Sequence, residues 1–318
     1  YLNSIIIPDS VKNIGENAFD YTQYYYSTEN WESNILYIGK HLIKARNSNL
    51  YTIKSDTLTI AGGAFSGCSS LTNITIPDTV TSIGDYAFSE CTSLTSITIP
   101  NSVMSIGDRA FYGCSSLTSV SFGENSQLTS IGEEVFSDCS NLKNIEIPVC
   151  VTNIGDSAFN GCSELTSITI PDSVTSIGDS TFSDCSSLTS ITIPASVTSI
   201  ADYAFSGCSN LTSVAFGENS QLTSIGDSAF NGCSSLISIT IPEGVTSIGN
   251  YLFYGCSSLT SITISDGVMN IGDYAFYGCT SLTSITIPNG VTSIGGDSFR
   301  GCSSLKNITV PDSVASIG

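Results

Sequence analysis

Residues 71–93 read LTNITIPDTVTSIGDYAFSECTS, and this stretch decides the fold because most of the chain repeats it. Each repeat contains one phenylalanine in register, and successive phenylalanines lie 23 residues apart, with two intervals of 25. They are Phe65, Phe88, Phe111, Phe136, Phe159, Phe182, Phe205, Phe230, Phe253, Phe276 and Phe299. Self-similarity at a short fixed period predicts a solenoid, in which each repeat forms one coil, here called a rung, that contacts only its neighbours.

The first half of the repeat predicts a β-strand. Leu71, Ile74 and Ile76 follow the pattern L-x-x-I-x-I, whose period of two sends Ile74 and Ile76 to the inner face. Asn73 and Thr75 then point to the outer face. The same spacing recurs in every later repeat, so we expect the strands to align in a parallel sheet with a polar outer face.

The second half of the repeat predicts a corner, a short extended segment and a single helical turn. Pro77 ends the strand because it has no N–H for a ladder bond. Val80 and Ile83 then give a second short segment, and Asp85 is placed to cap a helical turn that carries Phe88 inward. In both 25-residue repeats the corner is replaced by FGENSQL, at residues 122–128 and 216–222, which leaves the core register unchanged.

The full pattern, L-x-x-I-x-I-P-x-x-V-x-x-I-G-x-x-A-F-x-x-C, resembles the leucine-rich repeat, specifically its BspA-like or treponemal subfamily. At least 11 consecutive repeats match across residues 60–318, and ILYIGKHLIKA (35–45) is similar to a divergent segment of such arrays. The resemblance implies a strand-rich α/β solenoid, a right-handed horseshoe with a parallel β-sheet on its concave face and turns or helical turns elsewhere. It also implies a surface or secreted adhesin of host-associated bacteria or trichomonad protists.

We expect residues 1–318 to form one leucine-rich-repeat domain, because a repeat array has no internal domain boundary. Residues 1–19 are interpreted as a partial first repeat, 20–59 as a divergent segment and 60–318 as the regular array. The divergent segment is either two eroded repeats or an insert. Since the chain starts within a strand and stops within a repeat, we interpret it as a fragment of a longer secreted or anchored protein.

The charge is strongly acidic and unevenly spread. The net charge is −19, and residues 1–54 hold five basic and five acidic residues, so residues 55–318 carry the whole imbalance with four basic and 23 acidic residues. Such a surface repels phosphate backbones and anionic lipids. We therefore expect no nucleic-acid partner, and no apolar run is long enough for membrane insertion in this segment.

Eleven of the 12 cysteines also fall in register, three residues after each phenylalanine. Stacked side chains about 5 Å apart suit neither disulfide geometry nor, without a CxxC pair, a zinc site. We expect a file of buried, inert thiols. Cys150 lies outside the file, in the corner IPVCV, and is the thiol expected to be most exposed and reactive.

Acidic residues form another file: Asp85, Asp108, Glu133, Asp156, Asp179, Asp202, Asp227 and Asp273. Calcium between rungs is one interpretation, although the loops lack the alternating acidic pattern of a calcium-binding repeat. The favoured interpretation is a row of caps that also keeps the stack soluble. We therefore expect no metal and no cofactor.

The sequence offers no catalytic constellation. His41 is the sole histidine, and the repeated Ser, Asp and Cys positions would place the same trio on every rung, whereas catalytic sites are singular. We predict that the chain is not an enzyme.

Candidate partner-binding residues fall in two main groups, beside a weaker one of Tyr86, Tyr203, Tyr251 and Tyr274 next to the cap position on the outer face. Interfaces concentrate their energy in Trp, Tyr and Arg, and such residues gather in residues 21–54. The first group is Tyr24, Tyr25, Tyr26, Trp31, His41, Lys44 and Arg46; the alternative is that these residues only complete the irregular rungs. The second group, Thr98, Thr169 and Thr192, represents the hydroxyl-rich outer face of the sheet, where Thr also serves simply as a good strand former.

Two functions follow from these observations. The first is an extracellular or cell-surface recognition module, a monomer that binds a host matrix protein or another cell surface by many weak contacts. The second is a structural spacer or stalk with no ligand of its own, which the near-identity of the repeats favours. An intracellular scaffold is a third interpretation.

Overall fold

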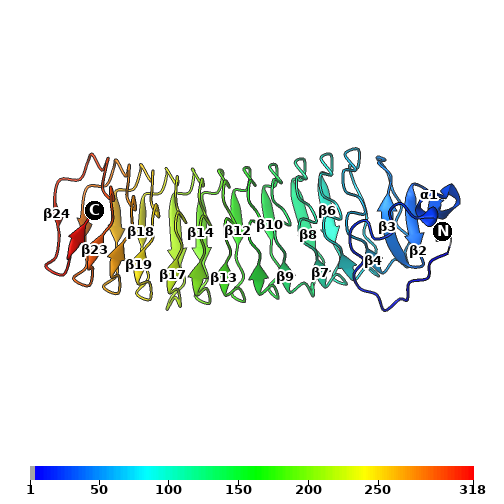
Figure 1. Cartoon of the computed structure of the whole chain (residues 1–318), viewed down its shortest axis with the longest axis horizontal. Coiled ribbons are helices and arrows are strands. Elements are labelled where there is room, and N and C mark those ends of the chain that lie inside the picture. The colour runs from blue at the N-terminus through cyan, green and yellow to red at the C-terminus, as the bar shows by residue number, and fades with distance from the viewer. Residues whose placement is uncertain (1–3) are drawn as a thin grey trace. The chain divides into compact units, whose positions relative to one another are not determined.

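The computed structural model describes residues 4–318, which divide after Thr152 into two compact units, the second being Asn153–Gly318. In each unit the chain winds into coils that stand side by side (Figure 1). The units are called unit 1 and unit 2 and are described separately. The prediction of a single domain over residues 1–318 stays a prediction.

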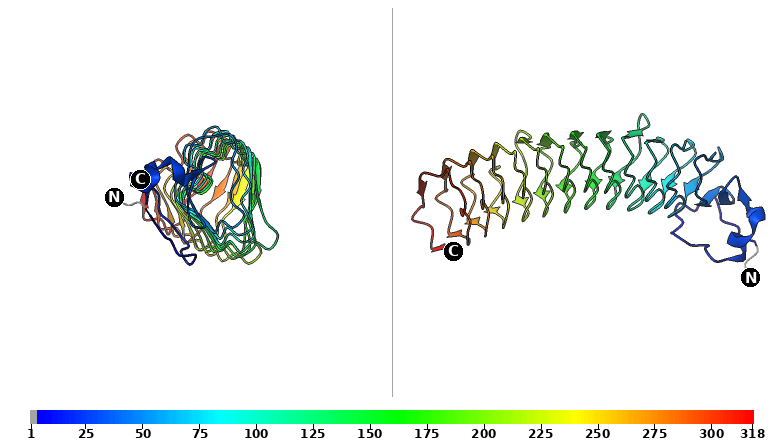
Figure 2. Two further views of the ribbon diagram at one scale, coloured as in Figure 1. Left: turned by 90° about the vertical axis from the view of Figure 1, so that its right-hand side faces the viewer. Right: turned by 90° about the horizontal axis from the view of Figure 1, so that it is seen from above.

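Unit 1 begins with the divergent segment. Its elements are α1 (Gln23–Tyr26), a 3-10 turn η1 (Thr28–Asn30), β1 (Trp31–Glu32), β2 (Ile35–Ile38) and β3 (His41–Ala45). β1, β2 and β3 pair antiparallel, and Gly39, with φ of +60°, lies in the tight turn between β2 and β3. Figure 2 shows α1 and this hairpin at the N-terminal end of unit 1.

The hairpin joins the array through β3. His41 and Leu42 pair in parallel with Thr59 and Ile60 of β4 (Thr59–Ile60), which pairs in turn with β5 (Ser82–Ile83). β3 thus occupies the place of the second short segment of a rung, whereas β1 and β2 have no counterpart in a regular repeat. The stretch ILYIGKHLIKA (35–45) therefore forms the strands β2 and β3, whereas residues 50–54 belong to no strand.

The regular part of unit 1 has two parallel ladders. The strands predicted from L-x-x-I-x-I form one sheet of β6 (Ser96–Ile99), β8 (Ser119–Phe122) and β10 (Asn144–Glu146), with Ile97 opposite Val120. The second segments are β5, β7 (Ser105–Ile106) and β9 (Ser130–Ile131). Residues 71–76 show the predicted alternation of buried and exposed side chains but are not hydrogen-bonded as a strand.

Unit 2 repeats this arrangement. The longer segments of its rungs are β12 (Ser167–Thr169), β14 (Ser190–Ile193), β16 (Ser213–Phe216), β18 (Ser238–Thr240), β20 (Ser261–Thr263), β22 (Ile285–Thr286) and β24 (Ile308–Thr309). The short second segments are β11 (Asn153–Ile154), β13 (Ser176–Ile177), β15 (Ser199–Ile200), β17 (Ser224–Ile225), β19 (Ser247–Ile248), β21 (Asn270–Ile271), β23 (Ser293–Ile294) and β25 (Ser316–Ile317). Equivalent residues of successive rungs pair with each other: Ser190 lies opposite Ser213, and Thr240 opposite Thr263.

The core of each unit consists of files of identical side chains. In unit 1 the rings of Phe65 and Phe88 stack with centroids 4.9 Å apart and planes 4° apart. In unit 2 the stacked phenylalanines from Phe159 to Phe299 are 5.4–5.8 Å apart. Tyr51 closes the file of unit 1, because its ring meets Phe65 edge-on at 5.1 Å.

The predicted helical turn after Asp85 is wrong. The residue that follows, Tyr86, has a φ of +55°, which a right-handed helix cannot accommodate. Instead, alternate N–H groups of this turn bond to the next rung: that of Tyr86 to the carbonyl of Asp108, and that of Phe88 to the carbonyl of Ala110. The turn therefore forms a third row of backbone hydrogen bonds between rungs, in addition to the rows made by the longer strands and by the short second segments.

Candidate functional site

The outer face of the strand sheets is rich in hydroxyl groups, as predicted. Thr98 on β6 is exposed, and its Oγ1 lies 3.0 Å from Oγ of Ser121 on β8. In unit 2, Thr169 on β12 and Thr192 on β14 are likewise exposed. These side chains are available to a partner, but neighbouring hydroxyls can also satisfy one another, as Thr98 and Ser121 do.

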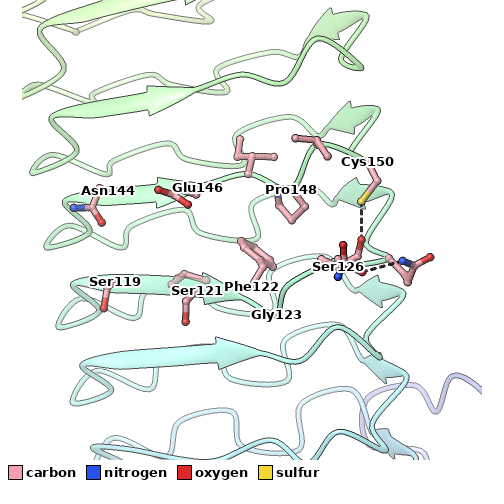
Figure 3. Close-up of a pocket in the computed structure, with 14 residues that line it drawn as sticks. Ser119, Ser121, Phe122, Gly123, Ser126, Asn144, Glu146, Pro148 and Cys150 are labelled. Atoms are coloured by element: carbon pink, nitrogen blue, oxygen red, sulfur yellow. Dashed lines mark hydrogen bonds between the residues drawn. The ribbon is translucent and has the colours of Figure 1, made fainter.

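Beside one of the long repeats, this face of unit 1 is hollowed (Figure 3). The hollow has a volume of about 720 Å³ and lies between the FGENSQL loop and the following strand and corner. Phe122 at the end of β8 forms its apolar floor and points toward Pro148 of the next rung, while Glu146 lies on β10 (Figure 3). Val149 at the rim is 86% exposed. We call this the Phe122 hollow.

Unit 2 has a matching feature beside its own FGENSQL loop. This Phe216 hollow, of about 650 Å³, is lined by Phe216, Gly217, Asn219, Thr240 and Pro242, with Glu243 on its rim. Both phenylalanines are half-buried, whereas the isoleucines at the same position of ordinary rungs, Ile99 and Ile193, are 0% exposed. Each long repeat thus exposes an aromatic ring next to hydroxyls and a carboxylate.

These two phenylalanines were missed as candidate contacts in the sequence. The signal was present, because Phe replaces Ile only where the corner is lengthened, at residues 122 and 216. Within a repeat that position is a core position, and the sequence does not show that the longer loop draws the ring partly out of the core.

The structure brings several predicted contact residues together in an N-terminal aromatic cluster. Tyr25 and Trp31 meet edge-to-face at 5.5 Å, and Tyr25 and Tyr26 at 5.6 Å. The guanidinium of Arg46 lies 4.1 Å from the centroid of the Trp31 ring, within the range of a cation–π contact. Tyr21, which is 85% exposed, tilts against Tyr26 at 6.5 Å.

Hydrogen bonds hold this cluster on the hairpin. Trp31 Nε1 donates to the carbonyl of Tyr25 at 2.8 Å, and Tyr24 Oη donates to the carbonyl of Tyr37 at 3.0 Å. Burial, aided by the charge of Asp20, raises the pKa of Tyr25, so this ring stays uncharged over the physiological range. Tyr26 and Arg46 remain exposed at the surface of the cluster.

His41, predicted as a partner contact, does not lie on this surface. Its side chain is 0% exposed; Nδ1 lies 2.8 Å from Thr59 Oγ1, and Nε2 lies 3.2 Å from the carbonyl oxygen of Pro8. The ring ties residues near the N-terminus to the first parallel strand pair. Lys44 is half-buried, with Nζ 3.4 Å from Asn17 Oδ1, and its role as a contact stays a prediction.

The cysteine file is a hydrogen-bonded part of the core. None of the 12 cysteines forms a disulfide, and the thiols of the file are buried. In unit 2, Cys185 Sγ donates to the carbonyl of Phe159 at 3.2 Å and Cys208 Sγ to that of Phe182 at 3.1 Å. Burial raises the pKa of Cys208 to about 12 and that of Cys302 to about 11, which disfavours the reactive thiolate.

Cys150 stands apart from this file, as predicted. It is half-exposed, and its Sγ lies 3.0 Å from the carbonyl oxygen of Ser126 (Figure 3). The carbonyl oxygen of Leu128 lies 3.1 Å from the same sulfur. Its thiol therefore anchors the long loop beside the Phe122 hollow.

The acidic file acts between rungs. Asp85 Oδ1 accepts the backbone N–H of Asp108 at 3.1 Å, and Asp108 Oδ1 accepts that of Glu133 at 2.9 Å. Across residues 4–318, no group of three or more His, Cys, Asp or Glu side chains is placed to hold a metal ion. Nor does any helix of this described part have the length and apolarity to cross a bilayer.

Comparisons with known proteins agree with this geometry. The model of a family described as BspA type Leucine rich repeat region matches residues 1–118, 37–160, 129–223 and 219–318. A solved leucine-rich repeat protein from Bacteroides ovatus is 35% identical, with a TM-score of 0.76, over 99% of this chain and 74% of its own. No curated protein matches the chain.

Two further solved structures extend the likeness. A leucine rich cell surface protein from Faecalibacterium prausnitzii is 29% identical over 91% of this chain and 86% of its own, with a TM-score of 0.51. The pneumococcal vaccine antigen PcpA, 19% identical over 90% of this chain and 92% of its own with a TM-score of 0.51, shares the fold. The predicted strand-rich repeat fold is thus confirmed, and the chain belongs to the BspA-type leucine-rich-repeat family.

Proposed function

We propose that this chain is a non-enzymatic recognition module at the cell surface or outside the cell, and that it binds a protein of the host matrix or of another cell. The observation that carries the proposal is the N-terminal aromatic cluster. There, Tyr21, Tyr26 and Arg46 are exposed on a base of packed rings.

The cluster has the composition of an interface hot spot. Tyr, Trp and Arg dominate the binding energy of protein interfaces because they combine a large apolar area with polar atoms at the tip. The edge-to-face contacts of Tyr25 hold the rings in place, so little side-chain entropy is lost on binding. The hydroxyl faces and the two hollows would add weaker contacts along the chain, which gives adhesion by avidity.

A surface location is supported by the relatives. The Faecalibacterium prausnitzii structure is described as a cell surface protein, and it is 29% identical over most of this chain. The net charge of −19 supports a protein partner over nucleic acid or anionic lipid.

A structural spacer is the second candidate. The observation in its favour is the repetition of the hydroxyl face, where Ser238 pairs with Ser261 and Thr240 with Thr263. In that case the cluster only completes the irregular end of unit 1.

Substitution of exposed residues distinguishes the recognition module from the structural spacer more clearly than deletion of residues 20–59 would. That deletion would also remove Ile35, Leu36 and Ile38, which are 0% exposed. The cluster variant Tyr21→Ser/Tyr26→Ser/Arg46→Ser leaves these core residues and Trp31 in place. A matched control, Tyr203→Ser/Lys306→Ser, removes one positive charge and exposed aromatic surface elsewhere.

Binding to immobilised matrix proteins and to host cells is the measurement. The recognition module predicts that the cluster variant binds at least about tenfold more weakly than the control variant, as expected for loss of a hot spot. Equal binding by the two variants would reject the cluster as the contact surface, and no binding by the unaltered chain would favour the spacer.

A further inference from the structure

Four tyrosines form a second aromatic surface, in unit 2. Tyr251 and Tyr274 stack with centroids 4.9 Å apart and planes 7° apart, and Tyr254 and Tyr277 stack at 4.8 Å and 5°. Within each rung the two rings meet at 5.9 Å and are tilted by 49° and 51°. We call these four residues the tyrosine grid.

The register of the rungs creates the grid. Tyr251 follows Asn250 and Tyr274 follows Asp273, the equivalent positions of two rungs, with φ of +55° and +56°. The second tyrosine of each rung comes three residues later on the same turn. Since each turn bonds to the next one, equivalent side chains lie one above the other: the N–H of Tyr251 bonds to the carbonyl of Asp273 at 2.8 Å. Tyr251 is 39% exposed, and the other three rings are half-buried.

The chain itself shows what fits against tyrosines of this turn. In unit 2 the guanidinium of Arg300, one rung after Tyr277, lies 5.8 Å from that ring's centroid. In unit 1 the guanidinium of Arg109, one rung after Tyr86, lies 5.6 Å from that ring, and its Nη1 donates to Tyr86 Oη at 2.6 Å. Two independent rungs therefore place a guanidinium on the face of a tyrosine that points toward the following rung.

The opposite face of the grid is bordered by small side chains. The preceding rung carries Ser228 and Asn231 at the positions of Tyr251 and Tyr254. Within residues 4–318, the rings that contact Tyr251 and Tyr254 are those of the grid itself, and no cationic group lies over either ring. Asp227 lies in the preceding rung, and residues 55–318 carry 23 acidic residues against four basic ones. Aromatic faces in an acidic surface attract cations.

We propose that the tyrosine grid binds an arginine-bearing segment of a protein partner, with a guanidinium against the faces of Tyr251 and Tyr254 that point toward the preceding rung. Arginine suits this surface better than lysine because its planar group stacks on a ring while its N–H groups reach the tyrosine hydroxyls. The proposal goes beyond the N-terminal aromatic cluster, since it concerns a different unit and different residues.

The chain supplies substitutions for the test. Ser157, Ser180 and Ser228 occupy the position of Tyr251 in other rungs with φ between +52° and +58°, and Asn160 and Asn231 occupy the position of Tyr254. The grid variant is therefore Tyr251→Ser/Tyr254→Asn/Tyr274→Ser/Tyr277→Asn. Tyr203→Ser is the matched control, because Tyr203 lies at the same turn position but between Ser180 and Ser228 of the neighbouring rungs. None of these changes alters the net charge.

The probes are an oligoarginine and an oligolysine peptide of equal length, and the measurement is the affinity of each at physiological salt. We expect the grid variant to bind oligoarginine about three- to tenfold more weakly than the unaltered chain, and the Tyr203→Ser control to bind it unchanged. The affinity for oligolysine should fall by a smaller factor. Replacing all four tyrosines by Phe keeps the rings and should retain most of the binding.

Equal oligoarginine affinity in the unaltered chain and the grid variant would overturn the proposal. So would a concentration-dependent dimer that the grid variant abolishes, because the occupant would then be a second copy of this chain. If the fourfold variant has a lowered unfolding midpoint, the single variant Tyr254→Asn is measured against Tyr203→Ser and interpreted in the same way. The grid test and the matrix-binding test use different residues and probes, so either can fail alone.

Discussion

The Oδ1 atom of Asp202 lies 2.7 Å from the backbone nitrogen of Asp227, the equivalent residue of the next rung, and accepts its hydrogen bond. Asp227 does the same for Asn250 at 2.8 Å, and Asn250 for Asp273 at 2.9 Å. An amide oxygen therefore replaces the carboxylate without breaking the chain of contacts. The acidic file therefore acts through its side-chain oxygens. In each of these three rungs the oxygen accepts a hydrogen bond from a backbone N–H of the next rung that has no backbone acceptor.

Asp202→Ala should lower the free energy of unfolding by about 0.5–1 kcal/mol, the usual cost of losing a side-chain cap on a backbone N–H. Asp202→Asn should be close to neutral, because Asn250 already serves in this way. Urea midpoints of the two variants and the unaltered chain, taken with one spectroscopic probe, provide the measurement. Equal loss in both variants would mean that charge, and not the acceptor atom, is what matters.

High pH should destabilise the fold through the cysteine file. Burial raises the pKa of Cys208 from 9.0 to about 12, so above pH 9 the unfolded chain releases a proton that the folded chain retains. The contribution of this thiol is fully present below pH 9 and is lost as the pH rises toward 12. The loss is about 1.4 kcal/mol per pH unit within that window.

The urea midpoint is therefore expected to be flat from pH 7 to 8.5 and to fall above pH 9. Cys208→Ser is the matched variant, since a hydroxyl can also donate to the carbonyl of Phe182 but does not titrate in this range. Its midpoint should fall less steeply. A variant that follows the unaltered chain at every pH would show that this thiol is not responsible.

The hollows should contribute to partner binding without being needed for folding. Phe122→Ile and Phe216→Ile introduce the residue that ordinary rungs carry at this position, where Ile99 and Ile193 are 0% exposed. We expect an unchanged unfolding midpoint and a loss of matrix binding of about three- to fivefold for the double variant, from the aromatic area removed. Binding that stays unchanged would leave the hollows as a by-product of the longer loops.

The regular rungs were predictable because every local signal agrees and recurs. Ile97 inward and Thr98 outward follow from the period of two, and the free, buried state of Cys185 follows from its file. The role of Asp85 was not predictable in the same way. Its position suits both a helix cap and a bond to the next rung, and the choice depends on Tyr86 adopting a positive φ.

The irregular end of unit 1 lies beyond single-sequence reasoning for a related reason. His41 was grouped with the exposed aromatic residues by proximity in sequence, but β3 pairs with β4 and the chain near Pro8 crosses over its ring. Those contacts join residues 18 and 33 positions apart in the sequence, and the repeat pattern does not predict them. Tyr25, Tyr26, Trp31 and Arg46 could be grouped correctly because short turns and a hairpin hold them close together.

The central claim is that like residues of successive rungs form files inside each unit, with the thiols sealed in the core. Counting alkylated cysteines by mass spectrometry, without reductant, tests it most directly. In the folded protein we expect rapid labelling at Cys150 alone, and after unfolding in urea at all 12 cysteines, because none of them forms a disulfide. Rapid labelling of several file cysteines in the folded protein, or fewer than 12 labels after unfolding because of a disulfide, would contradict the account.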